Sequence, residues 1–463
     1  MEARRLNAQA KNAIIKKVRQ VTTSKTINVI GAGLAGCECS YQLAKRGYLV
    51  NLYEMKPKKF SPAHSLTDFC ELVCSNSLKS SALTNACGLL KEEMRKMDSI
   101  TMLTADKTQV PAGGALAVDR EKYAKAVTDK LKKMPNINVI NEEVTDLNKL
   151  DGITVVATGP LTSDGLQEFL KNEISDFMYF YDAASPIVTA ESIDYEKSFF
   201  GDRYGKGDAD YLNCPMSKSE YLEFYNELIN AECVILKDFE KKDVFEGCMP
   251  IEIMAKRGVD TMCFGTLKPV GLSQDGEKHH AVLQLRYENE EKTLFNLVGF
   301  QTNLKFSEQK RVFSLIPALK NAEYVRYGVM HRNTFVNAPK VLNLGCQFKK
   351  NLNIFFAGQI TGVEGYVESA MSGLYTALQI DHLLKFGELL KINSKTMMGS
   401  LINYISKENA KFQPMNANFG IVDALEINIG VRNKIDRYKS IADLALQETE
   451  KNIKKFEGEQ DVD

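Results

Sequence analysis

A glycine-rich turn between an apolar strand and a helix most constrains what this chain can fold into. The apolar strand of residues 26–30 runs directly into Gly31, Gly33 and Gly36, which have the spacing Gly-x-Gly-x-x-Gly. Such glycines allow a tight turn, a close approach of the backbone to a pyrophosphate, and close packing of the helix on the strand. We therefore predict a Rossmann-like βαβ unit. The expected dinucleotide contacts in the turn are Gly31, Ala32, Gly33, Leu34, Ala35 and Gly36.

An acidic residue at the end of the next strand sharpens this prediction. A helix is expected from Cys37 to Arg46, and the strand that follows it ends on Glu54. In βαβ dinucleotide sites, an acid about 20 residues beyond the glycines binds the ribose hydroxyls of an unphosphorylated nucleotide. The sequence therefore favours FAD or NAD over NADP as the bound dinucleotide.

Composition limits the class of protein. The chain has 463 residues, enough for two or three domains, and 59 Lys and Arg balance 59 Asp and Glu. Any nucleic-acid site must therefore be a local basic patch. No apolar run is long enough to span a membrane, and the ten cysteines show neither a paired framework nor zinc spacing. We expect a cytoplasmic protein with free thiols, no membrane contact and no metal site.

The composition of the sequence changes near Tyr195. Lys, Glu, Tyr and Phe become frequent there, and the spacing typical of βαβ units disappears. The first domain resumes with a strand at residues 353–357 and a helix from Gly365. The predicted fold class is α/β, with a Rossmann-like FAD-binding domain interrupted by an inserted α+β domain. The predicted parts are a basic N-terminal extension (1–25), the FAD-binding domain (26–190 and 336–446), an inserted substrate or RNA domain (191–335) and a charged tail (447–463). We expect the tail to be a solvated helix that frays.

Other turns that follow predicted strands give further candidate contacts of the dinucleotide. One turn follows the strand that begins at Ile153, another lies at Pro111–Val118, and a third follows residues 353–357. A purely structural turn is the alternative for Pro111–Val118. The candidate contacts are Gly113, Gly114, Ala157, Thr158, Gly159, Gly358, Gln359, Gly362, Gly365 and Tyr366.

Several longer segments resemble the TrmFO family, which are folate- and FAD-dependent RNA uridine-5-methyltransferases related to the wobble-uridine enzyme GidA. The resemblance extends from residue 26 to about residue 430. It departs from the family at Asn303, Phe306 and Ser307, where His, Trp and Gly are expected. The segments that carry it are residues 31–36, 71–77 (ELVCSNS), 111–120 (PAGGALAVDR), 245–252 (FEGCMPIE), 254–258 (MAKRG), 326–335 (RYGVMHRNTF) and 356–370.

The resemblance implies FAD as cofactor, methylenetetrahydrofolate as one-carbon donor and NADH or NADPH as reductant. It implies that Cys248 is the nucleophile that activates uracil and that Cys74 is a second thiol or base. The chemistry agrees with this set, because uracil carbon-5 is a weak nucleophile until a thiolate adds to carbon-6, and a base must then remove the carbon-5 proton. A methylene carbon also needs two electrons to become methyl, which a flavin can supply.

The RNA target remains open at this point. The simplest target is the T-loop uridine of tRNA, with no stable protein partner required. One alternative is the same chemistry on a uridine of 23S ribosomal RNA, and a less favoured one is a GidA-type wobble-uridine modification with a partner GTPase. Residues 1–25 carry seven Lys or Arg and form either a basic arm for RNA or a frayed leader. The predicted RNA-binding residues, for which a solvated charged face is the alternative, are Lys256, Arg257, Lys310 and Arg311.

Overall fold

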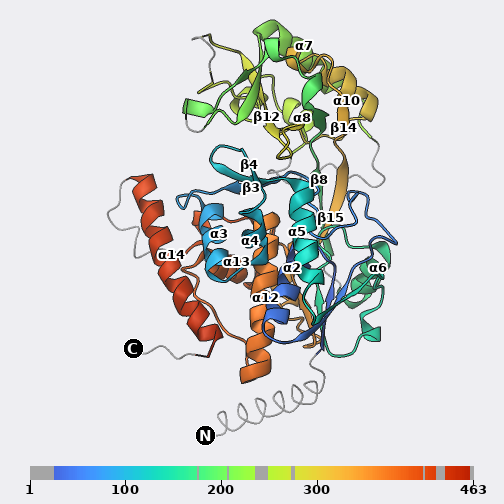
Figure 1. Ribbon diagram of the computed structural model, residues 1–463, viewed down its shortest axis with the longest axis vertical. Coiled ribbons are helices and arrows are strands. Elements are labelled where there is room, and N and C mark those ends of the chain that lie inside the picture. The colour runs from blue at the N-terminus through green and yellow to red at the C-terminus, as the bar shows by residue number, and fades with distance from the viewer. Residues whose placement is uncertain are drawn as a thin grey trace.

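The computed structural model describes residues 26–174, 177–205, 208–234, 249–272, 277–409, 412–423 and 433–458. It forms two bodies stacked along the longest axis of the molecule (Figure 1). The lower body is a parallel-sheet domain and the upper body is the inserted domain. The N-terminal extension 1–25 and Cys248 lie outside the described residues, so the predictions made for them stay predictions.

A five-stranded parallel sheet lies at the centre of the lower body, with strand order β16-β7-β1-β2-β6. Strand β1 lies between β2 and β7, with Ile27 paired to Val50 on one side and Ile153 on the other. Apolar side chains of β1 and β7 are buried, as in a sheet covered on both faces. The strands are β1 (Thr26–Ile30), β2 (Leu49–Tyr53), β6 (Ile137–Ile140), β7 (Ile153–Val156) and β16 (Ile354–Phe356).

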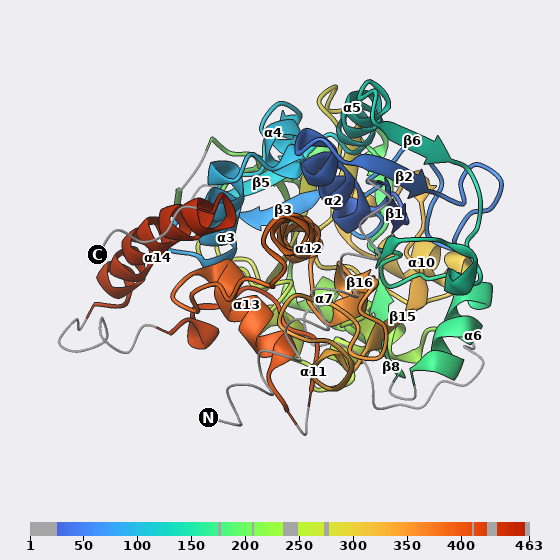
Figure 2. The same ribbon diagram turned by 90° about the horizontal axis from the view of Figure 1, so that it is seen from below.

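Helices cover this sheet, and α12 lies beside α2 in both ribbon views (Figure 2). Gly373 of α12 permits the close approach, because a Cβ there would lie 2.1 Å from the carbonyl oxygen of Ala35. The two helices place their N-termini near the same edge of the sheet. The helices of this body are α2 (Leu34–Lys45), α3 (Ala86–Lys96), α4 (Ile100–Ala105), α5 (Arg120–Lys132), α6 (Asp164–Glu173), α11 (Ala338–Val341), α12 (Tyr366–Phe386), α13 (Met397–Ser406) and α14 (Lys434–Phe456).

A small antiparallel sheet lies on the side of the lower body that faces the inserted domain (Figure 1). Its strand order is β3-β5-β4. Its central strand comes from the glycine-rich segment 111–118, which therefore supports the contact between the two bodies. The strands are β3 (Ser77–Ser80), β4 (Gln109–Val110) and β5 (Ala115–Val118).

The inserted domain has its own apolar core between a six-stranded sheet and several helices. Its strand order is β10-β11-β12-β13-β9-β14, and all its described pairings are antiparallel. The strands are β9 (Ile187–Thr189), β10 (Phe199–Phe200), β11 (Tyr211–Met216), β12 (Ala281–Tyr287), β13 (Leu294–Leu297) and β14 (Tyr324–Arg326). The helices are α7 (Lys218–Asn230), α8 (Ile251–Ala255), α9 (Thr261–Phe264) and α10 (Phe306–Phe313).

Two antiparallel strands carry the chain between the bodies. Strand β8 (Phe177–Ala183) leads up into the inserted domain, and β15 (Met330–Val336) leads back beside it. The six-stranded sheet accordingly runs from residue 187 to residue 326. The expected boundary at 190/191 lies just inside this sheet, and the expected boundary at 335/336 falls within β15.

The C-terminal helix α14 is longer and more buried than the solvated helical tail expected from residue 447. The expected start of the tail, residue 447, falls in the middle of α14, and the described chain continues to residue 458. Apolar residues spaced by three or four positions place one face of α14 against the lower body, and Ala445 and Phe456 are buried there. The charges of this segment lie on the opposite face. Among the described residues, no helix combines the length and the apolar character that crossing a bilayer requires.

Candidate functional site

The glycine turn has the geometry that the sequence predicted. Gly31 has a φ of +97°, and a Cβ at Gly36 would lie 1.8 Å from the carbonyl oxygen of Gly31. A Cβ at Gly33 would meet no atom within 4 Å, so this side of the turn is open. Gly33 begins α2 without a side-chain cap. The first N–H groups of the helix are therefore directed at open space, where a phosphate can accept hydrogen bonds from them.

A cleft opens at the carboxyl edge of the parallel sheet and collects most of the predicted dinucleotide contacts. The turn contributes its first five residues, and the ends of β7 and β16 contribute the opposite side. Two further contacts, Glu54 and Tyr366, lie at the end of β2 and the start of α12. The predicted residues that line the cleft are Gly31, Ala32, Gly33, Leu34, Ala35, Glu54, Ala157, Thr158, Gly159, Gly358, Gln359 and Tyr366.

The other predicted contacts lie outside the lining of this cleft. Gly36 packs α2 on the turn, while Gly362 and Gly365 have φ values of +87° and +118° in the turn that leads into α12. Gly113 belongs to the junction of the bodies, because its N–H donates to Asp210 Oδ2 at 2.6 Å. The N–H of Gly113 is therefore bonded to the inserted domain and is not directed at the cleft. Gly114, the next residue, lies in the same turn.

Glu54 connects the end of β2 to the glycine turn. Its Oε2 accepts a hydrogen bond from the N–H of Ala32 at 2.8 Å, and its Oε1 accepts one from the N–H of Lys56 at 3.0 Å. The carboxylate is buried at the edge of the cleft. It therefore has the acceptor character and the position that ribose hydroxyls require.

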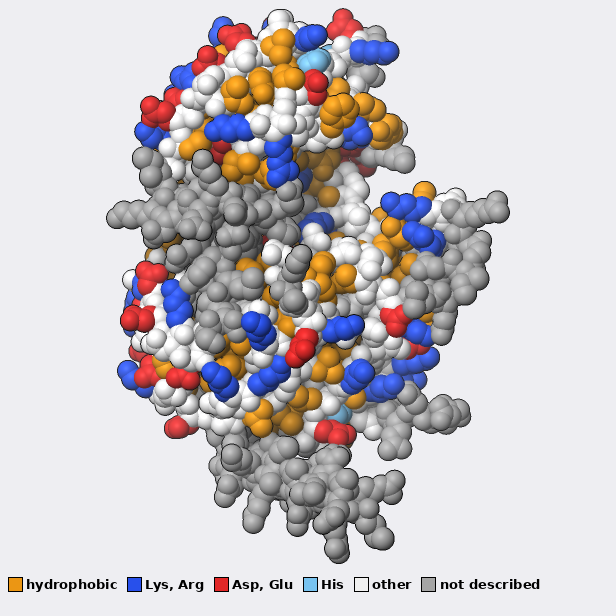
Figure 3. Space-filling view, turned by 180° about the vertical axis from the view of Figure 1, so that it is seen from behind, with side chains coloured by type: hydrophobic (Ala, Val, Ile, Leu, Met, Phe, Trp, Pro, Cys, Tyr) orange, Lys and Arg blue, Asp and Glu red, His pale blue; other side chains and the backbone are white. Residues whose placement is uncertain are grey.

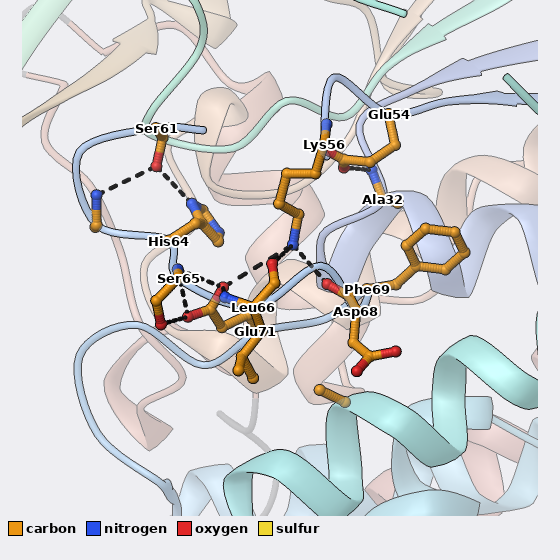
Figure 4. A network of polar contacts seen from close by, with 12 residues as sticks. Ala32, Glu54, Lys56, Ser61, His64, Ser65, Leu66, Asp68, Phe69 and Glu71 are labelled. Atoms are coloured by element: carbon orange, nitrogen blue, oxygen red, sulfur yellow. Dashed lines mark hydrogen bonds and ion pairs between the residues drawn. The ribbon is translucent and has the colours of Figure 1, made fainter. Parts of the chain in front are cut away.

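A network of polar contacts fixes the loop that follows β2 (Figure 4). The ammonium group of Lys56 is buried and donates to the carbonyl oxygens of Leu66, at 3.1 Å, and Asp68. The carboxylate of Glu71 accepts from the N–H groups of Ser65 and Leu66 at 2.9 to 3.0 Å. Lys56 and Glu71 lie 3.9 Å apart and both line the cleft. Their sequence spacing gave no signal for this arrangement.

His64 on the same loop is a cleft residue that the sequence motifs did not select. It lines the cleft, and its Nδ1 lies 2.5 Å from Ser61 Oγ. Burial lowers the pKa of His64, and the positive charge of Lys56 lowers it further. The imidazole is therefore neutral near pH 7. It can then offer the cleft either a donor or an acceptor.

Cys74 lies between the start of α12 and the end of β8. Its N–H and that of Ser75 donate to Tyr366 Oη at 2.7 and 3.1 Å. Its Sγ donates to the carbonyl oxygen of Ala183 at 3.5 Å. Burial raises the pKa of Tyr366, so the ring stays a neutral phenol. Since Tyr366 and Val73 both line the cleft, Cys74 is placed beside the dinucleotide site.

Charged and amide side chains join the Cys74 segment to the inserted domain. Arg120 donates from Nε to Glu288 Oε1 at 2.6 Å and from Nη1 to the carbonyl oxygen of Leu72. Arg286 of β12 donates from Nε and Nη2 to Asn76 Oδ1 at 3.1 and 2.8 Å. All four side chains are buried. This interdomain seam, defined by Asn76, Arg120, Arg286 and Glu288, holds the segment on both sides of Cys74.

The four predicted RNA-binding residues lie on two elements of the inserted domain. Lys256 and Arg257 are exposed at the end of α8, and Lys310 and Arg311 are exposed on α10. Arg311 forms ion pairs with Glu227 and Glu308. Figure 3 shows basic and acidic side chains interspersed over the visible face of both bodies. No single sign of charge covers this face, so an RNA would have to bind a local basic patch.

The cleft fits FAD on the features that this structure shows. Uncapped N–H groups at the start of α2 suit the pyrophosphate, the open side of Gly33 leaves room for it, and Glu54 suits a ribose. The cleft continues to Tyr366 at the start of α12, where the helix also lacks a side-chain cap. Within the described ranges, no cluster of His, Cys, Asp and Glu could hold a metal ion.

Comparisons with known proteins identify relatives over most of this chain. Residues 26–386 match the family described as Glucose inhibited division protein A. A protein of Acetivibrio thermocellus named Methylenetetrahydrofolate--tRNA-(uracil-5-)-methyltransferase TrmFO is 56% identical over 436 residues, which are 93% of this chain and 99% of that protein. A protein of the same name from Halalkalibacterium halodurans is 54% identical over 434 residues, again 93% of this chain and 99% of that protein.

Solved structures agree with the fold. GidA of Aquifex aeolicus superposes with a TM-score of 0.65 at 17% sequence identity, covering 93% of this chain and 75% of that one. A second crystal form of that protein also gives a TM-score of 0.65, at 16% identity, covering 92% of this chain and 76% of that one. The predicted α/β fold with a GidA-like dinucleotide domain is thereby confirmed.

Proposed function

Because this chain belongs to the TrmFO family, within the wider GidA family, we propose that it methylates carbon-5 of a uridine in tRNA. The one-carbon donor is methylenetetrahydrofolate, and the cofactor in the cleft is FAD. The observation that carries the proposal is the position of Cys74, which is hydrogen-bonded through its N–H to Tyr366, a residue of the dinucleotide cleft. A reactive thiol beside a flavin site is the arrangement that this reaction needs.

In this proposal the chain binds FAD mainly through its backbone. The N–H groups at the start of α2 hold the pyrophosphate, and Glu54 holds the adenosine ribose. Tyr366 and the start of α12 face the flavin end of the cleft. FAD, when bound and reduced, supplies the two electrons that convert the methylene carbon into a methyl group. NADH or NADPH is the reductant.

The thiols act on the uracil. The thiolate of Cys248 forms a bond to carbon-6, and the activated carbon-5 then bonds to the one-carbon unit, whose bond to its carrier nitrogen breaks. Once its own thiol proton has left, Cys74 takes the proton of carbon-5, and the bond from the Cys248 sulfur to carbon-6 then breaks as the double bond of the ring re-forms. Cys74 is suited to this role because its position is fixed. Its own N–H and that of Ser75 donate hydrogen bonds to Tyr366, and its thiol contacts the carbonyl oxygen of Ala183.

The remaining assignments follow from the composition of the chain and the proposed reaction. The protein works in the cytoplasm, where folate, nicotinamide cofactors and RNA are all present, and needs no stable protein partner. Lys256, Arg257, Lys310 and Arg311 contact the RNA backbone. A uridine of 23S ribosomal RNA is a second candidate target for the same chemistry. The basic segment 1–25 favours this candidate, since it could bind additional phosphates.

Mass spectrometry of RNase digests tests the proposal. The purified holoenzyme is incubated with methylenetetrahydrofolate, NADPH and either unmodified tRNA or unmodified 23S ribosomal RNA. We expect new 5-methyluridine in tRNA, and none with Cys248→Ala or Cys74→Ala. A methyl group found only in ribosomal RNA moves the target and keeps the chemistry. No methyl group in either RNA, with flavin bound and reducible, contradicts the proposed activity.

A further inference from the structure

Three aromatic rings form a continuous stack at one edge of the inserted domain. Tyr327 is the middle ring, 4.7 Å from Phe306 at an interplanar angle of 15° and 5.0 Å from Tyr324 at 7°. The hydroxyl of Tyr324 is buried without a hydrogen-bond partner among the described residues, which makes this the inner end. At the outer end, 52% of the Phe306 surface is exposed. We call these three residues the aromatic stack.

The aromatic stack adjoins the dinucleotide cleft through Arg326, which lies between Tyr324 and Tyr327 in the chain. Arg326 Nη2 donates to the carbonyl oxygen of Ala63 at 3.1 Å. Ala63 precedes His64, which lines the cleft. Strand β14, which carries Tyr324, lies beneath α10 on the side where β15 descends to the lower body (Figure 1). The segment that carries Tyr324 and Tyr327 is thus bonded, through Arg326, to the loop that borders the cleft.

The charge next to Phe306 is positive and includes an available ammonium group. Phe306 and Lys310 are four residues apart on α10, so they share one face of the helix. Lys310 is exposed and forms no ion pair within the described residues, whereas Lys305 is paired with Glu232 and Arg311 with Glu227 and Glu308. An anionic group near Phe306 therefore meets Lys310 first.

We propose that Phe306 is a stacking platform for an unpaired base of the RNA substrate, with Lys310 on the adjacent phosphate. This rests on the proposed function and adds a recognition site outside the cleft. A planar base continues the parallel stack of rings, and its phosphate supplies the charge that Lys310 lacks. A protein segment fits less well, because Lys305, Ser307 and Lys310 around the ring are polar and exposed.

The absence of tryptophan from this chain gives a direct test. In the holoenzyme, Phe306→Trp introduces a single tryptophan at the outer ring. Phe200→Trp is the matched control, because Phe200 is 44% exposed and lies on β10, at the opposite edge of the same sheet. Titration with an unmodified tRNA transcript is expected to quench the fluorescence of the Phe306→Trp variant saturably and to leave that of the control unchanged.

Binding measurements provide the second readout. Phe306→Ala is expected to weaken binding of the transcript about 5- to 150-fold, the range for loss of one base–aromatic stack. Phe306→Trp is expected to bind at least as tightly as the wild type, and Phe200→Ala is expected to bind like it. Lys310→Ala is expected to reduce the slope of log Kd against log salt by about one. Equal melting temperatures for all variants exclude a folding effect.

The outcomes separate this inference from the proposed function. If the wild type methylates tRNA but Phe306→Ala binds and methylates it equally well, the platform is overturned and the function stands. If the wild type binds RNA without methylating it, the function fails, and the quench of Phe306→Trp alone supports or overturns the platform. Fluorescence of that variant that depends on protein concentration and not on RNA shows that a second copy covers the ring, which overturns the inference. An absence of RNA binding overturns both.

Discussion

The cleft of the lower body and the aromatic stack of the inserted domain are built by different means. The cleft is formed mostly by backbone, with a glycine turn at Gly31–Gly36 and two uncapped helix ends around it. The aromatic stack is formed by side chains of α10 and of the segment around β14. Changes at the glycines that pack the turn therefore act on folding, whereas changes in the aromatic stack act on binding and leave the fold intact. We begin with the interdomain seam, which joins the two bodies that carry these regions.

The largest effect is expected from Arg120→Ala in the interdomain seam. It leaves Glu288 buried and unpaired, and the free energy of unfolding should fall by about 3–5 kcal/mol. Arg311→Ala, which breaks ion pairs of partly exposed side chains, should cost less than about 1 kcal/mol. Urea unfolding measures both. Similar small losses for the two variants would show that the seam does not hold the bodies together.

Within the cleft, two glycines should respond differently to the same added methyl group. Gly36→Ala places a Cβ against the Gly31 carbonyl and should lower stability by about 1–3 kcal/mol, with loss of bound flavin. Gly33→Ala meets no protein atom, so it should lower FAD affinity at unchanged stability of the FAD-free protein. Flavin absorbance and thermal melting of the purified variants measure the two effects. Full flavin content in Gly36→Ala contradicts the role of this turn.

The lower body should also show a pH dependence from one buried carboxyl group. Glu93 accepts the N–H groups of Met397 and Met398, and burial raises its pKa from 4.5 to about 8. Between these values the folded state keeps a proton that the unfolded state releases. The free energy of unfolding should therefore fall as pH rises through this window, by up to about 1.4 kcal/mol per pH unit.

Urea unfolding at pH 5 and pH 8 tests this prediction. Glu93→Gln should remove that part of the slope, while Glu92→Gln, a change at the partly exposed neighbouring residue, should keep it. In the inserted domain, burial also raises the pKa of Glu252, which accepts the N–H of Asn303. An unchanged slope in Glu93→Gln would mean that Glu93 is charged in the folded protein.

The smallest effect is expected from single charges on the surface of the inserted domain. Lys256→Ala should weaken RNA binding a few-fold and reduce the salt slope by about one, as for one lost phosphate contact. Arg311→Ala should change binding less, because Glu227 and Glu308 already neutralise the guanidinium. Anisotropy titrations with the tRNA transcript at several salt concentrations measure both slopes. A larger effect at Arg311 would reverse the assignment of the phosphate contacts.

The parts of the fold that local spacing determines could be predicted from the sequence. The glycine turn, Glu54 and the start of α12 fall in the cleft, as their spacing predicted. Strands β8 and β15 were not predicted, since each depends on pairing with the other about 150 residues away rather than on its own pattern. The buried face of α14 could not be predicted either, because charged residues dominate the composition of that segment.

The candidate site shows the same division. The conformation of the glycine turn could be predicted, because three glycines at this spacing indicate it directly. The surroundings of Cys74 could not, because Tyr366 contacts it, and Arg286 and Glu288 hold its flanking segment, from elements remote in sequence. Likewise, nothing in the local sequence of Lys56 indicates that its ammonium group is buried.

The pairing of β8 with β15 has a consequence for how such a protein can change over time. The chain leaves the lower body and returns to it through two strands that lie side by side. The inserted domain therefore enters and leaves through one two-stranded stem, so insertions and deletions within it need not disturb the sheet below. Lineages could reshape the parts of the upper body that lie away from the interdomain seam, while Arg286 and Glu288 must be kept to hold the segment around Cys74.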